Sequence, residues 1–376
     1  MVILIRCKDI DTDSRVLKYV SFLRHNQIDY KIISWNRSED RRFDENTINF
    51  GYRSSYNVGG WRAVKGRIKW MKFVVKTLKS LVKNDSVVIH ACDLDAAFPA
   101  TFFKHYYRKN IKVIFDVFDW FSSTLANQNK LITKAFGFME RFSVNYSDYV
   151  IICEKERRIQ IPFEIKDEAL FVLPNIPDFN KDDFLSKESN LEFNNELLTV
   201  AYVGGLYGER CLDELISLAE KGVFNLLIAG FGDQNLENRL KNSKQKNIKY
   251  FGRVPYERGL NIMYNADVIY AMYSKSNPNH LLAAPNKYYE AMFLGKPIIS
   301  TVGINLEEKI VSDNIGYTTE EDIYNIEKCI KSFSRSELLI KGKNAKKIWE
   351  SKYKNYIKDF LNKEYRNMIS INERLD

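Results

Sequence analysis

Short apolar runs rich in β-branched residues alternate along the chain with longer stretches whose apolar positions recur every three to four residues. This alternation is typical of βαβ units in a doubly wound parallel sheet, and not of a β-sandwich or a helix bundle. We therefore predict an α/β fold. The expected strands are Val2–Arg6, Tyr30–Trp35, Ser86–Ala91, Lys112–Phe118, Tyr149–Glu154, Leu170–Leu173, Leu198–Gly204, Asn225–Gly230, Ile248–Phe251, Val268–Tyr273 and Pro297–Val302, with Gly316–Thr319 as a further candidate.

The run of strands is interrupted once, at Leu173-Pro174-Asn175-Ile176-Pro177. Two prolines exclude a continuous helix here, and the stretch that follows, up to Asn195, is polar. We place a domain boundary at this point, which gives Rossmann-like domains of residues 1–174 and 175–345. Residues 346–376 read as a charged helix with an apolar stripe that includes Trp349, and this stripe needs a surface to pack on.

Composition narrows the class of protein. A chain of 376 residues with 45% hydrophobic residues can build two cores, and 8 Pro and 17 Gly argue against disorder. No stretch approaches about 18 uncharged apolar residues, and Arg6 and Lys8 interrupt any signal-peptide core, so we expect a cytoplasmic protein. The five cysteines are scattered and include no Cys-x-x-Cys pair, which predicts neither disulfides nor a zinc site.

The formal net charge of +9 lies entirely in the first half of the chain. Residues 1–174 hold 29 Lys and Arg against 20 Asp and Glu, whereas residues 175–376 hold 28 of each. A basic face is spaced as on a helix (Lys69, Lys72, Lys76, Lys79 and Lys83), and an apolar stripe has the same spacing (Ile68, Met71, Val75, Leu78 and Val82). The helix is either an ordinary surface helix or a docking surface for an anionic membrane, and the two are compatible.

A second basic and aromatic cluster, residues 102–109, ends the next helical segment and extends the same surface. We therefore expect peripheral attachment to the inner face of the cell membrane. His25 and His105 lie on charged helical faces and are expected to be solvated.

Two segments of the second half carry candidate chemistry. In Val203–Arg210, Gly204 and Gly205 join a strand to a helix. Glycines at such a junction indicate either a phosphate-binding site or simply tight packing of the backbone. Gly230-Phe231-Gly232 is a weaker example of the same pattern. A later helix begins after Pro285 and ends at Gly295, with Lys287 in its first turn. A lysine there opposes the helix dipole unless an anion is bound. Glu290 lies one turn later, where its carboxylate can either interact favourably with the helix dipole or bind a ligand.

On these segments the chain resembles the family 4 glycosyltransferases, which are retaining enzymes of the two-domain GT-B fold that use sugar nucleotides. Residues 285–300 look like the family's block P-x-K-x-x-E-A-M-x-x-G-x-P-I-I, and 203–210 like its phosphate loop. Phe251–Val254 is similar to the base-binding turn. In the first half, 90–95 and 115–119 resemble two strand-end motifs that face the cleft in the family.

The resemblance implies roles for particular residues. It puts Glu290 on the ribose hydroxyls, Arg210 and Lys287 on the diphosphate, and Asp119 near the sugar and acceptor. The full implied donor set is Gly204, Gly205, Arg210, Gly230, Arg253, Val254, Pro285, Asn286, Lys287 and Glu290, and the implied acceptor-side set is His90, Asp93, Asp95 and Asp119. It also implies that the C-terminal helix crosses back onto the first domain.

The implied reaction is transfer of a sugar from a nucleotide-sugar, more often a UDP-sugar than a GDP-sugar, to a lipid-linked or saccharide acceptor in surface-polysaccharide synthesis. No metal or other obligatory cofactor is implied, because preorganised cations and helix N–H groups can stabilise the leaving diphosphate.

Three positions depart from the family pattern. Gly205 stands where the family usually has Arg, Leu282 where it has Glu, and Phe118 where it has His. These departures affect the usual contacts to the transferred sugar, and His280 or Asn286 are candidates for a replacement contact.

Other interpretations remain open. Asp93-Leu94-Asp95 spells the Asp-x-Asp of metal-dependent transferases, but those have a single-domain fold, so a helix N-cap is the better interpretation. A sugar-nucleotide epimerase shares the two-domain fold. A nucleic-acid-binding protein would explain the basic half, yet the lysine face lacks interleaved aromatics, and we expect no nucleic-acid partner.

Overall fold

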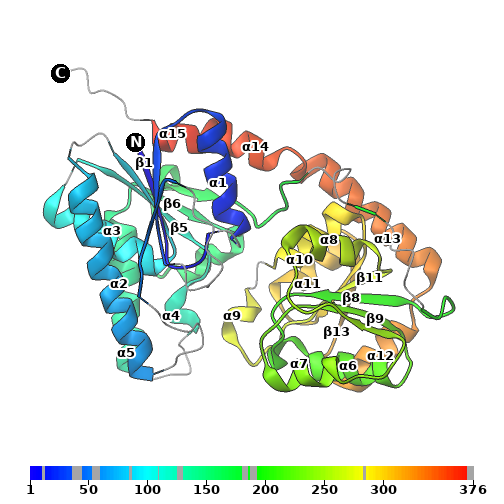
Figure 1. Ribbon diagram of the computed structural model, residues 1–376. Coiled ribbons are helices and arrows are strands. Elements are labelled where there is room, and N and C mark those ends of the chain that lie inside the picture. Colours follow the sequence, from blue (N-terminus) through cyan, green and yellow to red (C-terminus); the bar gives the residue numbers. More distant parts are fainter. Residues whose placement is uncertain are drawn as a thin grey trace. The chain divides into compact units, whose positions relative to one another are not determined.

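The computed structural model describes residues 1–10, 13–35, 45–52, 60–83, 87–108, 110–124, 130–179, 185–186, 193–282 and 285–370. The chain forms two compact units, shown in Figure 1. Unit 1 comprises Met1–Pro174 together with Ile357–Asp376, and unit 2 comprises Asn175–Tyr356. Ser86 and Lys109, which belong to an expected strand and to the basic and aromatic cluster, lie outside the described residues.

Unit 1 contains a seven-stranded parallel sheet of order β3-β2-β1-β4-β5-β6-β7. Its strands are β1 (Val2–Arg6), β2 (Tyr30–Ser34), β3 (Thr47–Asn49), β4 (Val88–Cys92), β5 (Lys112–Val117), β6 (Tyr149–Ile152) and β7 (Leu170–Val172). Its helices include α1 (Ser14–His25), α2 (Gly60–Leu81), α3 (Leu94–Tyr107), α4 (Phe121–Thr124), α5 (Lys130–Tyr146) and α15 (Arg366–Ile369).

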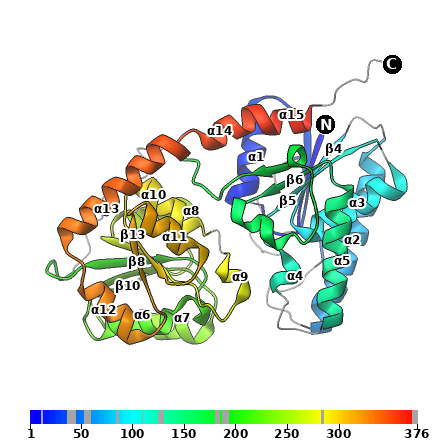
Figure 2. The same cartoon turned by 180° about the vertical axis from the view of Figure 1, so that it is seen from behind.

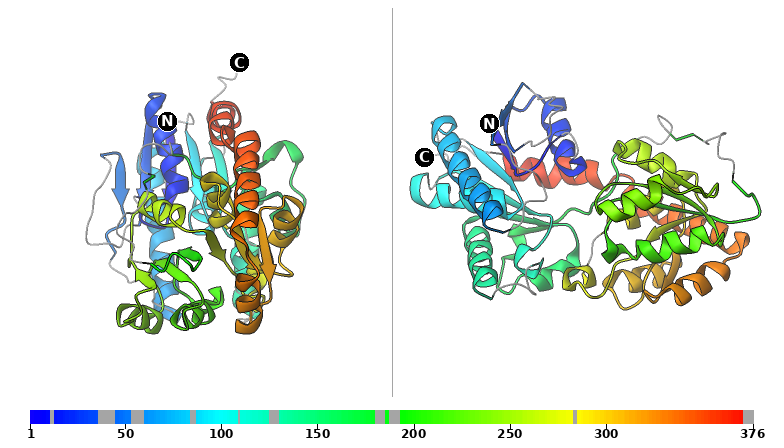
Figure 3. Two further views of the ribbon diagram at one scale, coloured as in Figure 1. Left: turned by 90° about the vertical axis from the view of Figure 1, so that its right-hand side faces the viewer. Right: turned by 60° about the horizontal axis from the view of Figure 1, so that its bottom comes forward.

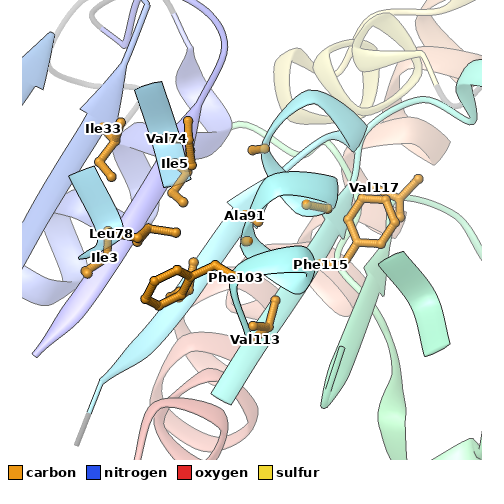
Figure 4. Close-up of a cluster of buried hydrophobic side chains, with 14 of the residues drawn as sticks. Ile3, Ile5, Ile33, Val74, Leu78, Ala91, Phe103, Val113, Phe115 and Val117 are labelled. Atoms are coloured by element: carbon orange, nitrogen blue, oxygen red, sulfur yellow. The ribbon is translucent and has the colours of Figure 1, made fainter. Parts of the chain in front are cut away.

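Side chains alternate between the two faces of this sheet. Ile3, Ala91 and Phe115 point to one face, where they pack with residues of α2 and α3 such as Leu78 and Phe103 (Figure 4). The residues between them, such as His90 and Asp116, must therefore point to the opposite face. Figure 3 shows the dark blue α1 and the red α15 together, apart from α2, α3 and α5.

Unit 2 contains a six-stranded parallel sheet of order β10-β9-β8-β11-β12-β13. The strands are β8 (Thr199–Val203), β9 (Asn225–Ala229), β10 (Ile248–Tyr250), β11 (Val268–Ala271), β12 (Ile298–Thr301) and β13 (Gly316–Thr319). One face carries α6 (Leu212–Glu220), α7 (Gln234–Lys241) and α12 (Ile323–Lys331), and the other carries α8 (Tyr256–Tyr264), α10 (Asn286–Leu294) and α11 (Asn305–Ser312), as Figure 2 shows. A short helix, α9, spans Pro278–Leu281.

The last part of the chain is helical from α13 (Arg335–Ile348) through α14 (Tyr356–Phe360) to α15, with π-helical turns at Trp349–Tyr353 and Leu361–Tyr365. Trp349 stacks edge-on against Phe293 of unit 2, with ring centroids 5.1 Å apart. Unit 2 therefore extends to Tyr356, beyond the expected limit at residue 345. The expected final helix, residues 346–376, is divided between the two units at this point.

Tyr365 fixes the C-terminal segment within unit 1. Its side chain is fully buried against Tyr19 of α1, and its hydroxyl lies 3.0 Å from His90 Nδ1. Arg366 adds a hydrogen bond to the Asn26 side chain at the end of α1. The segment is thus held by a buried polar contact as well as by apolar packing.

The α/β fold class predicted from the sequence is confirmed, and each expected strand has a counterpart with ends shifted by a few residues. The prediction missed β3, Thr47–Asn49. This strand is three residues long, lies at the sheet edge and is only half-buried, so it carries almost no apolar pattern.

The basic helix forms as α2, and its buried stripe agrees with the expected one at Leu78 and Val82 but differs at Ile68. Trp70, Val74 and Leu78 are buried against the core, whereas Ile68 is 46% exposed. Trp70 occupies the centre because its ring stacks on Trp35 and its Nε1 donates to the Asp95 carbonyl. Lys69, Lys72, Lys76, Lys79 and Lys83 are all exposed, as expected, although Lys83 lies beyond the end of the helix.

We predict that Tyr365→Phe destabilises unit 1. The change removes the hydroxyl that His90 contacts in the core, and a lost buried hydrogen bond costs about 1–3 kcal/mol. The midpoint of thermal unfolding should therefore fall. The matched change Tyr324→Phe, at a residue that is 68% exposed, should leave it unaltered. Equal midpoints for the two variants would show that the contact contributes nothing.

Candidate functional site

The order of strands in unit 2 defines where a ligand can reach the sheet. The connections that follow β8 and β11 leave in opposite directions from neighbouring strands, and ligands of doubly wound sheets bind at the carboxyl ends of such a pair. The segment after β8 contains Gly204 to Arg210, and the segment after β11 contains Tyr273 to His280. They meet here, since the Ser274 N–H donates to the Glu209 carbonyl at 2.9 Å.

Close backbone approach explains the glycines at this edge. A Cβ atom on Gly230 would lie 1.8 Å from the Gly204 carbonyl oxygen, and one on Gly204 would lie 2.8 Å from Lys287 Nζ. The Gly230 N–H donates to the Gly252 carbonyl at 2.8 Å, which joins the expected base-binding turn to the same edge. Gly252 itself has a φ of 65°, a conformation that favours glycine.

Two cations occupy this edge. The Arg210 guanidinium lies 4.2 Å from the centre of the Tyr273 ring, and Lys287 Nζ lies 4.7 Å from that of Tyr202. Neither cation is in an ion pair within the described ranges, and Arg210 Nη1 is buried with no hydrogen-bond partner among those same residues. A buried cation without a partner carries a desolvation cost that an anion would offset.

Lys287 is placed at the N-terminus of α10, directly after Pro285. Burial, opposed by the charge of Glu290 and helped by that of Arg210, lowers the pKa of its ammonium to about 8. Among the described residues no side chain caps the start of α10, so the first N–H groups, at the positive end of the helix dipole, lie beside Lys287 without a side-chain acceptor. This end of the helix is therefore suited to an anion.

Glu290 is almost completely buried, at 4% exposure. The Tyr256 hydroxyl, at the start of α8, donates a hydrogen bond to its carboxylate, and burial together with this carboxylate raises the pKa of Tyr256 well above its usual value. Tyr256 holds Glu290 in one orientation from a different helix.

The remaining expected donor residues lie at the margin of this site. Arg253 is exposed and stacks 4.8 Å from the Phe231 ring, and Val254 is half-buried. Asn286 is exposed at the first position of α10, and Gly205 is close to the Tyr207 ring.

Sequence reasoning missed the tyrosines that line the site. Tyr202 lies within β8 and donates from its hydroxyl to the Gly205 carbonyl at 2.6 Å, while Tyr273 supports Arg210. In the sequence, both tyrosines look like ordinary core residues. The signal that the sequence offers is a tyrosine within an otherwise aliphatic strand, because a buried tyrosine hydroxyl needs a hydrogen-bond partner.

In unit 1 the strand ends bring together Arg6, Asp93 and Phe118. The Arg6 guanidinium forms a short ion pair with Asp93 and lies 4.2 Å from the centre of the Phe118 ring. The Asp93 carboxylate also accepts from the Phe118 N–H at 2.9 Å. Asp93 has a φ of 68° and does not cap α3 with its side chain, so the helix N-cap interpretation needs correction: Asp93 joins three strand ends instead.

Asp119 and Asp95 differ in access. The Asp119 side chain is 59% exposed and its Oδ1 lies 3.0 Å from Arg157 Nη1. The Asp95 side chain is only 17% exposed and lies 3.5 Å from Arg67. Of the two, Asp119 is the carboxylate that a ligand can reach.

His90 does not fit the expectation that it faces a ligand. It is fully buried, because the alternation along β4 turns it toward α1 and Tyr365. Burial lowers the pKa of its imidazole, so the ring is neutral at pH 7.

His90, Cys92 and Asp116 lie close enough together to suggest a metal site, but the group does not fit one. The Asp116 carboxylate already accepts from Arg15 at 2.7 and 3.0 Å and from Tyr19 at 2.9 Å. Although burial opposes it, Arg15 with His90 holds the pKa of Asp116 well below its usual value, and the guanidinium would repel a metal ion.

The two parallel-sheet units define the GT-B fold of glycosyltransferases, as expected. Residues 183–356, a little less than half of the chain, match the family model described as "Glycosyl transferases group 1". A comparison with curated proteins gives no match. The family match and the fold together support a glycosyltransferase.

Solved structures similar to this one cover almost the whole chain. Sucrose-phosphate synthase from Thermosynechococcus elongatus has a TM-score of 0.71 at 14% identity, with 98% of each chain covered. Anabaena Alr3699/HepE, in complex with UDP and glucose, has a TM-score of 0.68 at 12% identity, over 98% of this chain and 99% of that one. WaaG, a glycosyltransferase involved in lipopolysaccharide biosynthesis, gives 0.66 at 13% identity, over 98% and 99%. At these identities the likeness shows the fold.

We predict that binding of a nucleoside diphosphate weakens as pH rises through 8. The Lys287 pKa of about 8 is raised by a bound anion, so above pH 8 binding must take up a proton. Affinity for UDP or GDP, measured by calorimetry, should fall about tenfold between pH 7 and pH 9. Lys287→Met should bind more weakly with little pH dependence, whereas the exposed Lys331→Met should keep the wild-type profile. An unchanged profile in Lys287→Met would contradict the assignment.

Proposed function

We propose that this protein is a retaining glycosyltransferase that moves a sugar from a nucleotide-sugar to an acceptor. The observation that carries the proposal is the pair of partly buried cations, Arg210 and Lys287, which form no ion pair with any residue that the structure describes and lie where β8 and β11 end. The two linked phosphates of a nucleotide-sugar would neutralise these two cations.

The arrangement suits cleavage of a bond between a sugar and a diphosphate. The sugar carbon becomes electron-deficient while negative charge builds up on the leaving diphosphate. Arg210, Lys287 and the N–H groups at the start of α10 would stabilise that charge with little reorganisation, because the fold already holds all three at this edge of the sheet. The chemistry then needs no metal, and the leaving phosphate itself can take the proton of the acceptor hydroxyl.

Glu290 would bind the ribose hydroxyls, with Tyr256 fixing the carboxylate so that it presents its remaining lone pairs. Gly230, Gly252 and Arg253 would then border the base. We favour a UDP-sugar donor; the likeness to HepE, whose structure holds UDP and glucose, is consistent with it.

We assign the acceptor to unit 1, with Asp119 as the accessible carboxylate and Asp93 positioned by Arg6. A lipid-linked or saccharide acceptor of surface-polysaccharide synthesis would suit the basic charge of this unit. WaaG, which acts in lipopolysaccharide biosynthesis, shares the fold.

Membrane attachment would follow from the helices α2, α3 and α5, which we call the basic helical layer. They contain eleven Lys and Arg residues and two acids, Asp95 and Glu140, of which Glu140 is buried. Exposed apolar side chains accompany the charge, with Leu131 at 76%, Phe138 at 66% and Tyr106 at 61%. No helix in the described ranges has the length and apolarity to cross a membrane. We infer reversible docking on the inner face of the cell membrane.

A thermal-shift screen with UDP, GDP and their sugar derivatives tests the donor site. A ligand at 100 times its dissociation constant stabilises the protein by about 2.7 kcal/mol. We expect one nucleotide to give a clear shift that is lost in Glu290→Ala and in Lys287→Ala but kept in the controls Glu327→Ala and Lys331→Ala, which lie on the distant α12.

Two results would count against the proposed reaction. If no nucleotide stabilises the wild-type protein, the donor site does not exist. If a sugar nucleotide is interconverted with its epimer in the absence of any acceptor, the protein is an epimerase.

Flotation with lipid vesicles tests the basic helical layer. Lys72→Glu, Lys76→Glu and Lys79→Glu together should weaken binding to vesicles rich in phosphatidylglycerol by at least about 3 kcal/mol, roughly a hundredfold. Neutral phosphatidylcholine vesicles should bind the wild-type protein weakly.

The matched control reverses three exposed lysines of unit 2, Lys221, Lys328 and Lys331. If this control loses as much binding as the triple change in α2, the attachment reflects net charge alone and the basic helical layer has no special role.

A further inference from the structure

The ring of Tyr207 lies against bare backbone at the carboxyl end of the unit 2 sheet. A Cβ atom on Gly205 would lie 2.4 Å from Tyr207 Cε2, and the next two atoms that it would meet, Cδ2 and Cζ, belong to the same ring. A Cβ atom on Gly232 would lie 3.0 Å from Tyr207 Cε1. Two glycines, one after β8 and one after β9, therefore leave the space that this ring occupies.

Gly205 is needed for this contact and not for the course of the backbone. Its φ is not positive, unlike that of Gly252, so a residue with a side chain could adopt the same backbone conformation. What an alanine at this position would meet is the Tyr207 ring. Glycine at position 205 thus keeps the ring where it is.

The backbone around Tyr207 is fixed on both sides. Leu206 is fully buried and forms a parallel β-bridge with Gly232, and Tyr207 continues the extended conformation with φ −133° and ψ 145°. Successive side chains of an extended chain point to opposite sides, so a buried Leu206 turns Tyr207 outward. The Tyr207 carbonyl accepts from the Arg210 N–H at 3.0 Å, and a single turn therefore holds both the ring and the cation.

About half of this ring is open to a ligand. Tyr207 is 51% exposed, and Phe231, the exposed ring after β9, is 50% exposed. Glycine backbone buries little apolar area against a ring, so Tyr207 gains only part of the stabilisation that a buried aromatic side chain provides. The flat group of a ligand would cover the rest.

The ring lies between the diphosphate and the base of the proposed donor. Along the strand order β10-β9-β8-β11, Arg210 contacts Tyr273 after β11, whereas Tyr207 contacts Gly232 after β9. The turn after β10, which contains Gly252, is the next in this order. A donor whose diphosphate lies at Arg210 and whose base borders this turn must pass the Tyr207 ring.

We propose that the Tyr207 ring stacks on the base of the donor, and that position 205 is a glycine because a larger residue would displace this ring. The inference rests on the proposed function, because it takes Arg210 to bind the donor diphosphate. The ligand class is a nucleoside diphosphate, whose base has a flat face on which an aromatic ring can stack.

A double-mutant cycle tests the inference, with affinity for UDP or GDP, whichever binds, measured by calorimetry at pH 7.5. Tyr207→Ala and Gly205→Ala should each weaken binding about tenfold, as expected for the loss of one stacked base. The double variant should bind no more weakly than Tyr207→Ala alone, because the added methyl group then has no ring to displace. Tyr207→Phe keeps the ring and should stay within about twofold of wild type.

Inorganic pyrophosphate separates the base from the phosphates. Its affinity should be the same for the wild-type protein, Tyr207→Ala and Gly205→Ala, because it has no base to stack. The control Tyr324→Ala removes a ring on α12 that is 68% exposed, and it should change neither affinity. Melting temperatures of all variants should show that they remain folded.

Three results would overturn the inference. Equal losses for pyrophosphate and the nucleoside diphosphate would mean that the ring only shapes the phosphate loop. A loss from Gly205→Ala that persists in the Tyr207→Ala background would mean that the methyl group itself blocks the ligand. Unchanged nucleoside diphosphate affinity in Tyr207→Ala would mean that the base lies elsewhere.

Failure of the proposed function gives a different result. If the wild-type protein binds no nucleoside diphosphate, the proposed function fails and this inference fails with it. In the three results above the wild-type protein still binds, which keeps the two kinds of failure distinct.

Discussion

Two cations that form no ion pair within the described residues, Arg210 and Lys287, are the constraint around which unit 2 is arranged. Arg210 is supported by an aromatic ring and Lys287 by burial at a helix N-terminus, and neither has a carboxylate partner within the described residues. Such an arrangement costs folding free energy, because both the helix dipole and desolvation oppose it. Its persistence is understandable if an anion completes the site, and the absence of a Cβ atom on Gly204 lets the Lys287 ammonium reach this strand end.

In unit 1, by contrast, the buried charges described here are paired with each other. Arg15 of α1 is paired with Asp116, and Arg6 of β1 with Asp93 and Asp13, so these positive charges are neutralised inside the protein. Buried pairs of this kind fix conformation more than they add stability. They join β1, β4 and β5, and through His90 and Tyr365 they reach the C-terminal segment. Much of the surplus positive charge of this unit is on the exposed lysines of α2, where solvent can reach it.

Much of the candidate site was predictable because its signals are local. The glycines after β8, and Lys287 and Glu290 on α10, are recognisable from spacing alone. His90 was misjudged because its motif resembles a strand end that faces a ligand, while the alternation of β4 turns this residue into the core. The stripe of α2 was misjudged at Ile68, which fits a helical period, whereas the burial of Trp70 depends on Trp35, the residue that follows β2.

The sequence by itself determined the α/β class, nearly all the strands, the sign and location of the surface charge, and the residues that cap α10, because these depend on neighbours within a few positions along the chain. The tertiary structure decided which side chains meet. It placed Tyr256 on Glu290, Glu209 opposite His280, and Arg15 on Asp116. These contacts join segments that only the order of the parallel strands brings together, and no local pattern encodes that order.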